Sequence, residues 1–242
     1  MNSILLDKKL GIIGGGQLGK MLLSECNKMD VTTHVIDSNK SSPCKNLCDK
    51  FYCGDLNDYD TIINFGKECD LLTFEIEHIN VDALEDLEKM GKEIYPKPDT
   101  LRIVQDKNKQ KCFFKDNKIP SANFRYFKSQ KDFMSSIEKN NVKFPCVWKK
   151  TKFGYDGFGV KILKSAEDAK NLPDSEMIIE DKIPFEKELS VIVARNKNGD
   201  LKYYKTVEME FNKKSNQVEY VISPANISDD IHRKASDLAI KI

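Results

Sequence analysis

The chain has no excess of charge of either sign. Its 39 lysines and arginines nearly match its 38 aspartates and glutamates, which leaves a formal net charge of +1. Proteins that bind nucleic acid or anionic membranes mainly through charge carry a basic excess, so this balance supports neither partner. The sequence also lacks an apolar run of membrane-spanning length and an N-terminal signal-peptide core. These absences predict a soluble, cytoplasmic protein.

Cysteine is present, but not in a pattern that builds disulfides or a zinc site. The chain has seven cysteines in 242 residues, and an odd number in so long a chain is not typical of a secreted disulfide framework. Cys44, Cys48 and Cys53 are clustered, but their spacing is not that of a zinc ribbon. We therefore expect reduced thiols. The length suits one large or two small globular domains.

The N-terminal segment combines a strand, a glycine turn and a helix. Lys9–Ile13 is predicted to be a buried strand, and Gly14-Gly-Gly-Gln-Leu-Gly19 follows it with G-x-G-x-x-G spacing. The helix that extends to about Met29 would present free N–H groups and positive potential to an anion. A second strand, 31–36, leads to Asp37, where a dinucleotide-binding fold places its ribose-binding acid. An NAD(P)-dependent oxidoreductase is therefore one alternative.

A pair of carboxylates follows the third predicted strand, residues 70–74. Glu75 and Glu77 stand at its carboxyl end, which is the mouth of an open α/β sheet and the usual place for a ligand. Strand alternation would put both side chains on one face. Alternatively, one or both of them cap the helix that begins near Val81. Spacing alone favours neither reading.

The stiff segment Pro96-Lys-Pro98 marks the predicted domain boundary, which gives domains 1–98 and 99–242. One long helix, capped by Asp99 or Thr100, is predicted to run from there through Asn117. Its charge run is expected to form a solvated face.

We assign every residue of that charge run to the solvated face except Lys107 and Lys111. Farther along, Leu201–Val207 and Gln217–Ser223 are predicted to pair as antiparallel strands, with Glu208-Met-Glu210 and Asn212 between them.

The stretch from Phe144 to Arg195 concentrates residues suited to a nucleotide. An apolar run ends at Lys149, and the loop Thr151-Lys-Phe-Gly-Tyr-Asp-Gly-Phe-Gly159 follows. Glycines there allow positive φ and bring N–H groups close to an anion, and phosphate is the usual anion that needs N–H groups and a lysine together. Glu180 and Glu188 could accept hydrogen bonds from an amine or a ribose hydroxyl. A glycine-rich hairpin with solvated charges is the alternative.

Six blocks occur in an order that resembles the ATP-grasp enzymes, and among them the N5-carboxyaminoimidazole ribonucleotide synthetases. The resemblance extends over essentially the whole chain. It implies an α/β fold with an N-terminal Rossmann-like parallel sheet, followed by an incomplete α+β ATP-grasp domain whose nucleotide-binding subdomain covers about 120–195. The blocks are GIIGGGQLGKM, TFEIEHIN, QDKNKQKCFF, WKKTKFGYDGFG, IIEDKIPFEKELSVIVAR and VEMEF followed by VISPA.

The resemblance implies a carbon–nitrogen ligase of purine biosynthesis. Such an enzyme uses ATP, Mg²⁺ and bicarbonate to form carboxyphosphate, and passes the carboxyl group to the exocyclic amine of 5-aminoimidazole ribonucleotide. It is expected to be a cytoplasmic homodimer. The nearest rival within the superfamily is a formate-dependent transformylase that acts on a glycinamide ribonucleotide. A non-catalytic nucleotide-binding module is a further alternative.

The resemblance also assigns residues, position by position. The substrate phosphate would be held by Gly14, Gly15, Gly16, Gln17, Leu18 and Gly19. The catalytic residues facing the imidazole substrate would be Glu75, Tyr155 and Asp156. ATP would be bound by Lys107, Lys149, Gly154, Tyr155, Asp156, Gly157, Phe158, Gly159, Val160, Glu180, Asp181, Lys182, Ile183, Glu188 and Asn212.

Three departures from the family pattern stand out. Phe158 occupies a position where many relatives carry an arginine, and Asn212 stands where a histidine is expected. The chain also stops before the Glu and Glu-x-Asn magnesium ligands of an ATP-grasp fold, so no metal ligand is expected within 1–242. We therefore expect a truncated chain that does not turn over alone.

Overall fold

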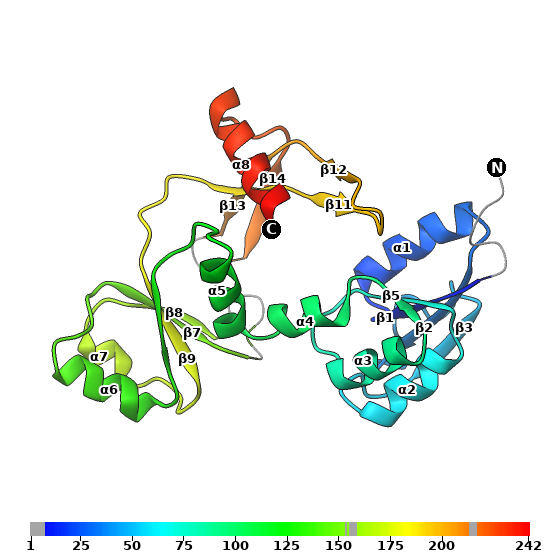
Figure 1. The fold of residues 1–242 in the computed structure, drawn as a ribbon, viewed down its shortest axis with the longest axis horizontal. Helices are drawn as coiled ribbons and strands as arrows, with labels where there is room; N and C mark the ends of the chain where they lie inside the picture. Colours follow the sequence, from blue (N-terminus) through cyan, green and yellow to red (C-terminus); the bar gives the residue numbers. More distant parts are fainter. Residues whose placement is uncertain (1–7, 153, 155–158, 213–216) are drawn as a thin grey trace. The chain divides into compact units, whose positions relative to one another are not determined.

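The structure is a computed structural model that describes residues 8–152, 154, 159–212 and 217–242 (Figure 1). It divides into two compact units, residues 1–106 and 107–242. The predicted boundary at Pro98 lies before this division, and helix α4 (Pro98–Val104) belongs to the first unit.

The first unit is built on a parallel sheet with the strand order β3-β2-β1-β4-β5. Central strand β1 pairs with β2 and β4, so that Ile13 lies beside Ile36 on one side and Phe74 on the other. The carboxyl ends of these three strands therefore meet at one edge of the sheet, as the Rossmann-like prediction requires. The strands are β1 (Lys9–Ile13), β2 (Thr32–Asp37), β3 (Lys50–Cys53), β4 (Leu71–Phe74) and β5 (Glu93–Ile94).

Helices cover this sheet because the side chains of β1 alternate between its two faces. Ile12 belongs to a buried cluster with Leu23 of α1, whereas Ile13 belongs to a second cluster with Ile62 of α2 and Leu84 of α3. Both clusters are apolar, which is typical of a parallel sheet buried on both faces. The remaining helices of the unit are α1 (Gln17–Lys28), α2 (Tyr59–Lys67) and α3 (Val81–Lys89).

The second unit contains an antiparallel sheet with the order β6-β9-β7-β8. Its core gathers Phe133 of α6 and Trp148, Met177 and Ile179 of the sheet. The elements are α5 (Lys107–Asp116), β6 (Phe124–Phe127), α6 (Gln130–Glu138), β7 (Cys146–Lys150), β8 (Val160–Leu163), α7 (Ala166–Ala169) and β9 (Met177–Asp181).

Beyond β9 the chain forms a three-stranded sheet of order β10-β13-β14 and a separate hairpin of β11 and β12. Ser228 caps the last helix by accepting a hydrogen bond from the Ile231 N–H. All five residues of β14 are exposed, and β14 is the last strand of its sheet. The elements are β10 (Glu188–Ser190), β11 (Val193–Arg195), β12 (Leu201–Tyr203), β13 (Val207–Phe211), β14 (Val218–Ile222) and α8 (Asp229–Lys241).

The long helix predicted through Asn117 is wrong, because the structure has two helices, α4 and α5, separated at Gln105 and Asp106. The Lys107 N–H donates to the Thr151 carbonyl at 2.9 Å and not to a carbonyl of α4. The Gln105 side-chain amide also donates to the carbonyls of Glu77 and Ile79. Contacts with distant residues therefore interrupt the helix.

The strand predicted over 201–207 is also divided. Its first part, β12, pairs with β11, whereas β13 begins at Val207 and pairs with β10 and β14. Glu208 and Glu210 consequently lie inside a strand and not in a connection between strands.

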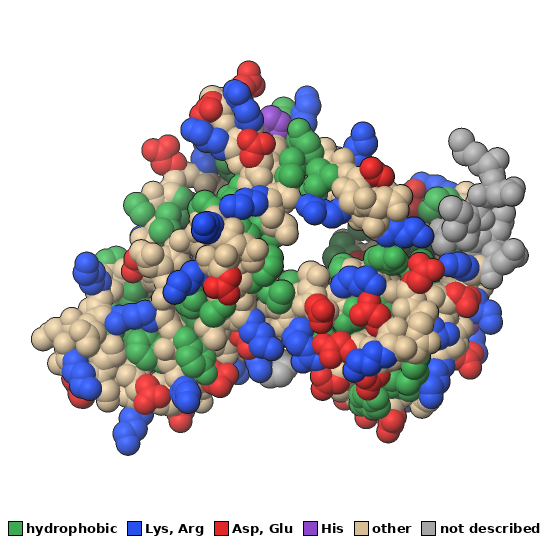
Figure 2. Space-filling model, in the orientation of Figure 1, with side chains coloured by type: hydrophobic (Ala, Val, Ile, Leu, Met, Phe, Trp, Pro, Cys, Tyr) green, Lys and Arg blue, Asp and Glu red, His purple; other side chains and the backbone are tan. Residues whose placement is uncertain are grey.

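Within the described part of the chain, no helix is both long and apolar enough to cross a membrane. Figure 2 shows basic and acidic side chains interspersed over the visible face, in keeping with the formal net charge of +1.

Candidate nucleotide and sugar-phosphate sites

The glycine turn between β1 and α1 is shaped by close backbone contacts. Gly14 has φ of 101°, a conformation that L side chains rarely adopt, and its N–H donates to the Ile36 carbonyl at 2.9 Å. A Cβ on Gly19 would lie 2.6 Å from the Gly14 oxygen, so helix α1 can pack this closely only with glycine there. Gly16 caps α1 without a side chain, and a Cβ there would meet nothing within 4 Å. The first turn of α1 is therefore open to an anion.

Asp37 holds this turn in place. Its Oδ2 accepts from the Gly15 N–H and its Oδ1 from the Asn39 N–H, both at 2.7 Å. The Gly15 carbonyl in turn accepts from the Ser42 hydroxyl at 2.5 Å. Both carboxylate oxygens therefore serve the backbone, which gives Asp37 a structural role in the turn. Each oxygen retains a second lone pair that can accept a hydrogen bond from a ligand.

Glu75 lies directly beside the glycine turn. Its N–H donates to the Ile13 carbonyl at 2.9 Å, and a Cβ on Gly14 would lie 3.5 Å from the Glu75 Cβ. Burial raises the pKa of the Glu75 carboxyl above its usual range. Neither Glu75 nor Glu77 caps α3, because that role belongs to Asn80, whose side chain accepts from the Ala83 N–H. The capping alternative is therefore wrong.

Strand β4 ends at Phe74, so strand alternation does not govern the residues after it. Glu75, Ile76 and Glu77 all line one cleft of about 230 Å³. The Gln105 side-chain amide fixes this segment by donating to the carbonyls of Glu77 at 2.6 Å and Ile79 at 2.9 Å. The other lining residues are Phe74, Pro96, Thr100, Leu101 and Val104.

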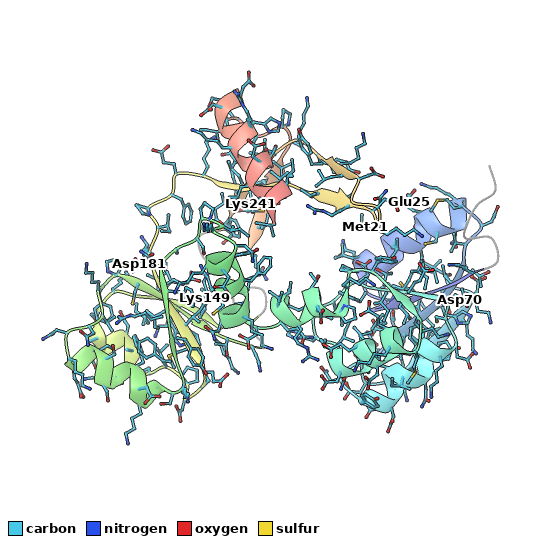
Figure 3. The ribbon with its side chains drawn as sticks, in the orientation of Figure 1. Met21, Glu25, Asp70, Lys149, Asp181 and Lys241 are labelled. Atoms are coloured by element: carbon cyan, nitrogen blue, oxygen red, sulfur yellow. The ribbon has the colours of Figure 1, made fainter. Side chains whose placement is uncertain are left out.

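A larger cleft, of about 900 Å³, lies in the second unit. It brings together seven of the residues predicted to bind ATP, although their positions in the chain extend from 149 to 188. Figure 3 labels two of them, Lys149 and Asp181, on the four-stranded sheet. The seven are Lys149, Val160, Glu180, Asp181, Lys182, Ile183 and Glu188, and the others are Ala122, Val147, Ile162, Pro184, Phe185, Lys187 and Leu189.

The wall of this cleft contains a buried carboxylate between two lysines. The Glu180 side chain is 7% exposed; Lys149 Nζ lies 2.8 Å from its Oε2, and Lys111 Nζ lies 3.0 Å from its Oε1. The β7–β9 register explains the first contact, since Glu180 faces Val147 and Lys149 lies two residues farther along the same strand. A buried carboxylate needs such compensation to stay ionised.

Some predicted residues lie outside the lining of the cleft. Lys107 begins α5, and Asn212 follows β13, where its N–H donates to the Gln217 carbonyl at 2.9 Å. Gly159 has φ of 79°, and its carbonyl accepts from the Lys150 N–H at 2.8 Å. Gly154 is described but does not line the cleft. The predictions for Tyr155, Asp156, Gly157 and Phe158 lie outside the described residues.

Two features of the site were not assigned from sequence. Lys111 was separated from the solvated face of its helix but received no role, although it follows Lys107 by four residues and so lies on the same helix face. Lys187 also lines the cleft and pairs with Glu208 at 2.8 Å. No local pattern indicates this ion pair, because Lys187, which precedes β10, and Glu208 of β13 come together only when the two strands pair.

Among the residues that the structure describes, no three His, Cys, Asp or Glu side chains gather into a group that could hold a metal ion. Mg²⁺ is usually bound by one or two carboxylates together with substrate phosphates, which requires no such group.

Both units match known domain families. Residues 7–105 match the family model of the ribonucleotide synthetase preATP-grasp domain, and residues 112–242 match that of the ATP-grasp domain. Phosphoribosylaminoimidazole carboxylase of Ogataea methanolica is 34% identical over 239 residues, which cover 95% of this chain and 43% of that protein. N5-carboxyaminoimidazole ribonucleotide synthase of Bacillus subtilis is 32% identical over 242 residues, which cover 96% of this chain and 61% of that protein.

Solved structures of proteins named for the same reaction are also similar to this chain. N5-carboxyaminoimidazole ribonucleotide synthetase of Thermotoga maritima is 36% identical with a TM-score of 0.84, and the match covers 97% of this chain and 60% of that one. N5-carboxyaminoimidazole synthase of Aspergillus clavatus, in complex with ADP and 5-aminoimidazole ribonucleotide, is 28% identical with a TM-score of 0.87. That match covers 98% of this chain and 62% of the other. The chain therefore spans between 43% and 62% of these four proteins.

Proposed function

Because the chain belongs to the ATP-grasp family, we propose that it takes part in the ATP-dependent carboxylation of 5-aminoimidazole ribonucleotide. The product is N5-carboxyaminoimidazole ribonucleotide, formed with bicarbonate in purine biosynthesis. One observation carries the proposal: a single cleft gathers Lys149, Val160, residues 180–183 and Glu188, all expected to bind ATP. The relatives named for this reaction support the choice of substrate.

In this proposal the second unit binds ATP. The backbone of residues 180–183 reads the edge of the adenine, and Glu188 accepts from the ribose hydroxyls. Lys149 neutralises phosphate charge, which grows on the transferred group during phosphoryl transfer. Lys107 is proposed to act at the phosphates, while the flap over them is assigned to residues 154–160. Asn212 completes the proposed set near the nucleotide.

The first unit is proposed to hold the sugar phosphate. The N–H groups at the start of α1 and the turn from Gly14 to Gly19 suit a 5′-phosphate. Glu75 borders this turn and is proposed to face the aminoimidazole. Tyr155 and Asp156 are proposed to join it there. We assign the substrate phosphate to the first unit and the nucleotide to the second.

The proposed reaction has two steps. A bicarbonate oxygen attacks the γ-phosphorus of ATP, which breaks the bond to the β,γ-bridging oxygen and releases ADP, leaving carboxyphosphate. The exocyclic amine then attacks the carboxyl carbon, phosphate leaves with the C–O bond electrons, and the amine loses a proton. The protein contributes positioning and charge neutralisation, because two anions and an amine must be held together.

Three finer parts of the proposal are supported by family membership alone. These are a requirement for Mg²⁺, assembly as a homodimer and a cytoplasmic location. The described side chains form no metal cluster. A second candidate is a nucleotide-binding module that does not turn over.

Two measurements separate these functions. Calorimetry on the 242-residue chain should detect binding of ATP but not of NAD, and Lys149→Ala should abolish the ATP signal. Exposed Lys202 on β12 provides a matched control, since Lys202→Ala should leave binding unchanged. Binding of NAD without ATP would overturn the assignment.

Turnover is tested by ADP release that depends on both bicarbonate and 5-aminoimidazole ribonucleotide. The ligase proposal expects such release. The assay is run once with added Mg²⁺ and once without it, so that the dependence on the ion is measured. ATP binding without substrate-dependent ADP release from this chain would support the binding module instead.

A further inference from the structure

The Lys111–Glu180–Lys149 triad contains one more positive charge than it needs to neutralise its carboxylate. Two ammonium groups lie within 3.0 Å of a single carboxylate whose side chain is 7% exposed. A single lysine would suffice to compensate one buried carboxylate. The second lysine therefore calls for a role of its own.

The two lysines face different surroundings. Lys149 is 29% exposed and lines the 900 Å³ cleft, so it can reach both Glu180 and a bound ligand. Lys111 is 11% exposed and lies on α5, outside the lining of that cleft. It approaches the carboxylate from the side of a separate pocket that it lines with Ser121 and Phe124.

Lys111 is fixed at this position by a second contact. Its Nζ donates to the Ser121 hydroxyl at 2.5 Å. Among the described residues, Glu180 Oε1 has no partner with hydrogen-bond geometry, so Lys111 compensates it by proximity of charge. Lys149 Nζ lies 2.8 Å from Oε2. Because Ser121 fixes Lys111, we regard Lys111 as the anchored counter-ion of Glu180, whereas Lys149 borders the cleft.

We propose that Lys111 is a positioning residue: it remains the counter-ion of Glu180 and thereby frees Lys149 to move from the carboxylate to the phosphates of ATP. The inference rests on the proposed function. Without Lys111, the departure of Lys149 would leave a buried carboxylate uncompensated, which is strongly unfavourable. Lys111 itself does not touch the nucleotide.

The test compares ATP with adenosine, which lacks phosphates, by calorimetry on the full chain. Lys111→Met should weaken ATP binding by about tenfold or more, because a charge-assisted contact to phosphate is lost. Adenosine binding should stay within about threefold of the unchanged chain. Loss of both ligands equally, or of neither, while the unchanged chain binds ATP, would overturn the inference and leave the proposed function intact.

A double variant separates positioning from direct contact. Glu180→Gln removes the charge that needs compensation, so adding Lys111→Met to it should change ATP affinity by no more than about threefold. An equally large effect of Lys111→Met in both backgrounds would mean that Lys111 acts otherwise, and would overturn the inference.

Two further variants serve as controls. Lys111→Arg keeps the charge and should retain the preference for ATP over adenosine; a loss as large as that of the methionine variant would contradict the role. Exposed Lys115 lies four residues farther along α5, and Lys115→Met should leave both affinities unchanged. An equal effect of Lys115→Met would reveal a general effect of helix charge and overturn the inference.

Should Lys111→Met not fold, the arginine and double variants still decide. If the unchanged chain binds no ATP, the proposed function fails first and this inference with it.

Discussion

The Gly15 N–H donates to the Asp37 carboxylate over 2.7 Å and joins the glycine turn to the end of β2. The side chain in the position of a ribose ligand thus also holds the backbone of the turn. The glycine turn and Asp37 together shape the start of α1.

This bond predicts a loss of stability on Asp37→Ala. Two backbone N–H groups, of Gly15 and Asn39, lose their acceptor. We expect the free energy of unfolding in urea to fall by about 1–3 kcal/mol. Asp237→Ala, at an exposed position on α8, should change it little. Equal stability of the two variants would show that Asp37 does not hold the turn.

The glycines of the turn offer a matched pair. A Cβ on Gly19 would lie 2.6 Å from the Gly14 oxygen, whereas a Cβ on Gly16 would meet nothing within 4 Å. Gly19→Ala should therefore lower the free energy of unfolding by about 1–3 kcal/mol through overpacking. Gly16→Ala should cost less, about 0.5–1 kcal/mol, because alanine is a poorer helix N-cap than glycine. Urea unfolding of both variants checks this, and a reversed order would contradict the packing.

Glu75 predicts a pH dependence with a definite sign. Because burial raises its pKa in the folded state, the folded protein holds this proton more tightly than the unfolded chain. The contribution of Glu75 to stability is therefore lost as the pH rises from the usual glutamate pKa of 4.5 through the raised pKa of the folded state. Glu75→Gln removes this loss, so its stability relative to the unchanged chain should increase with pH. Unfolding at several pH values checks this, with neighbouring Glu77→Gln as the control.

The cysteines predict a graded thiol titration. Cys53 and Cys112 are exposed, whereas burial raises the pKa of Cys69 to about 12 and of Cys146 to about 11. A thiol reagent at neutral pH should modify the exposed pair rapidly and the buried thiols only after unfolding. Mass spectrometry of partly labelled chain identifies the sites. Rapid labelling of Cys69 in the folded chain would contradict its burial.

The sequence predicted those features that depend on neighbouring residues. The glycine turn and helix α1 each follow from a few consecutive residues, and the structure confirms them. Strand β3 was missed because Lys50–Cys53 is short and only partly buried, which leaves little alternation to detect. Element boundaries moved by a residue or so for similar reasons.

The remaining differences arise from contacts between distant residues. The break between α4 and α5 depends on Gln105 reaching the carbonyls of Glu77 and Ile79, and on Lys107 reaching Thr151. The role of Lys111 likewise depends on a carboxylate in β9. Such pairings follow from tertiary packing, which a single sequence does not display.

Strand β14 carries a consequence for handling the protein. Val218, Tyr220, Val221 and Ile222 are all exposed on a strand that ends its sheet. A free strand edge with apolar side chains on both faces readily templates the backbone of another extended chain. Concentrated solutions should therefore lose protein to strand-to-strand association, and a lysine introduced at Tyr220 should keep more of it in solution.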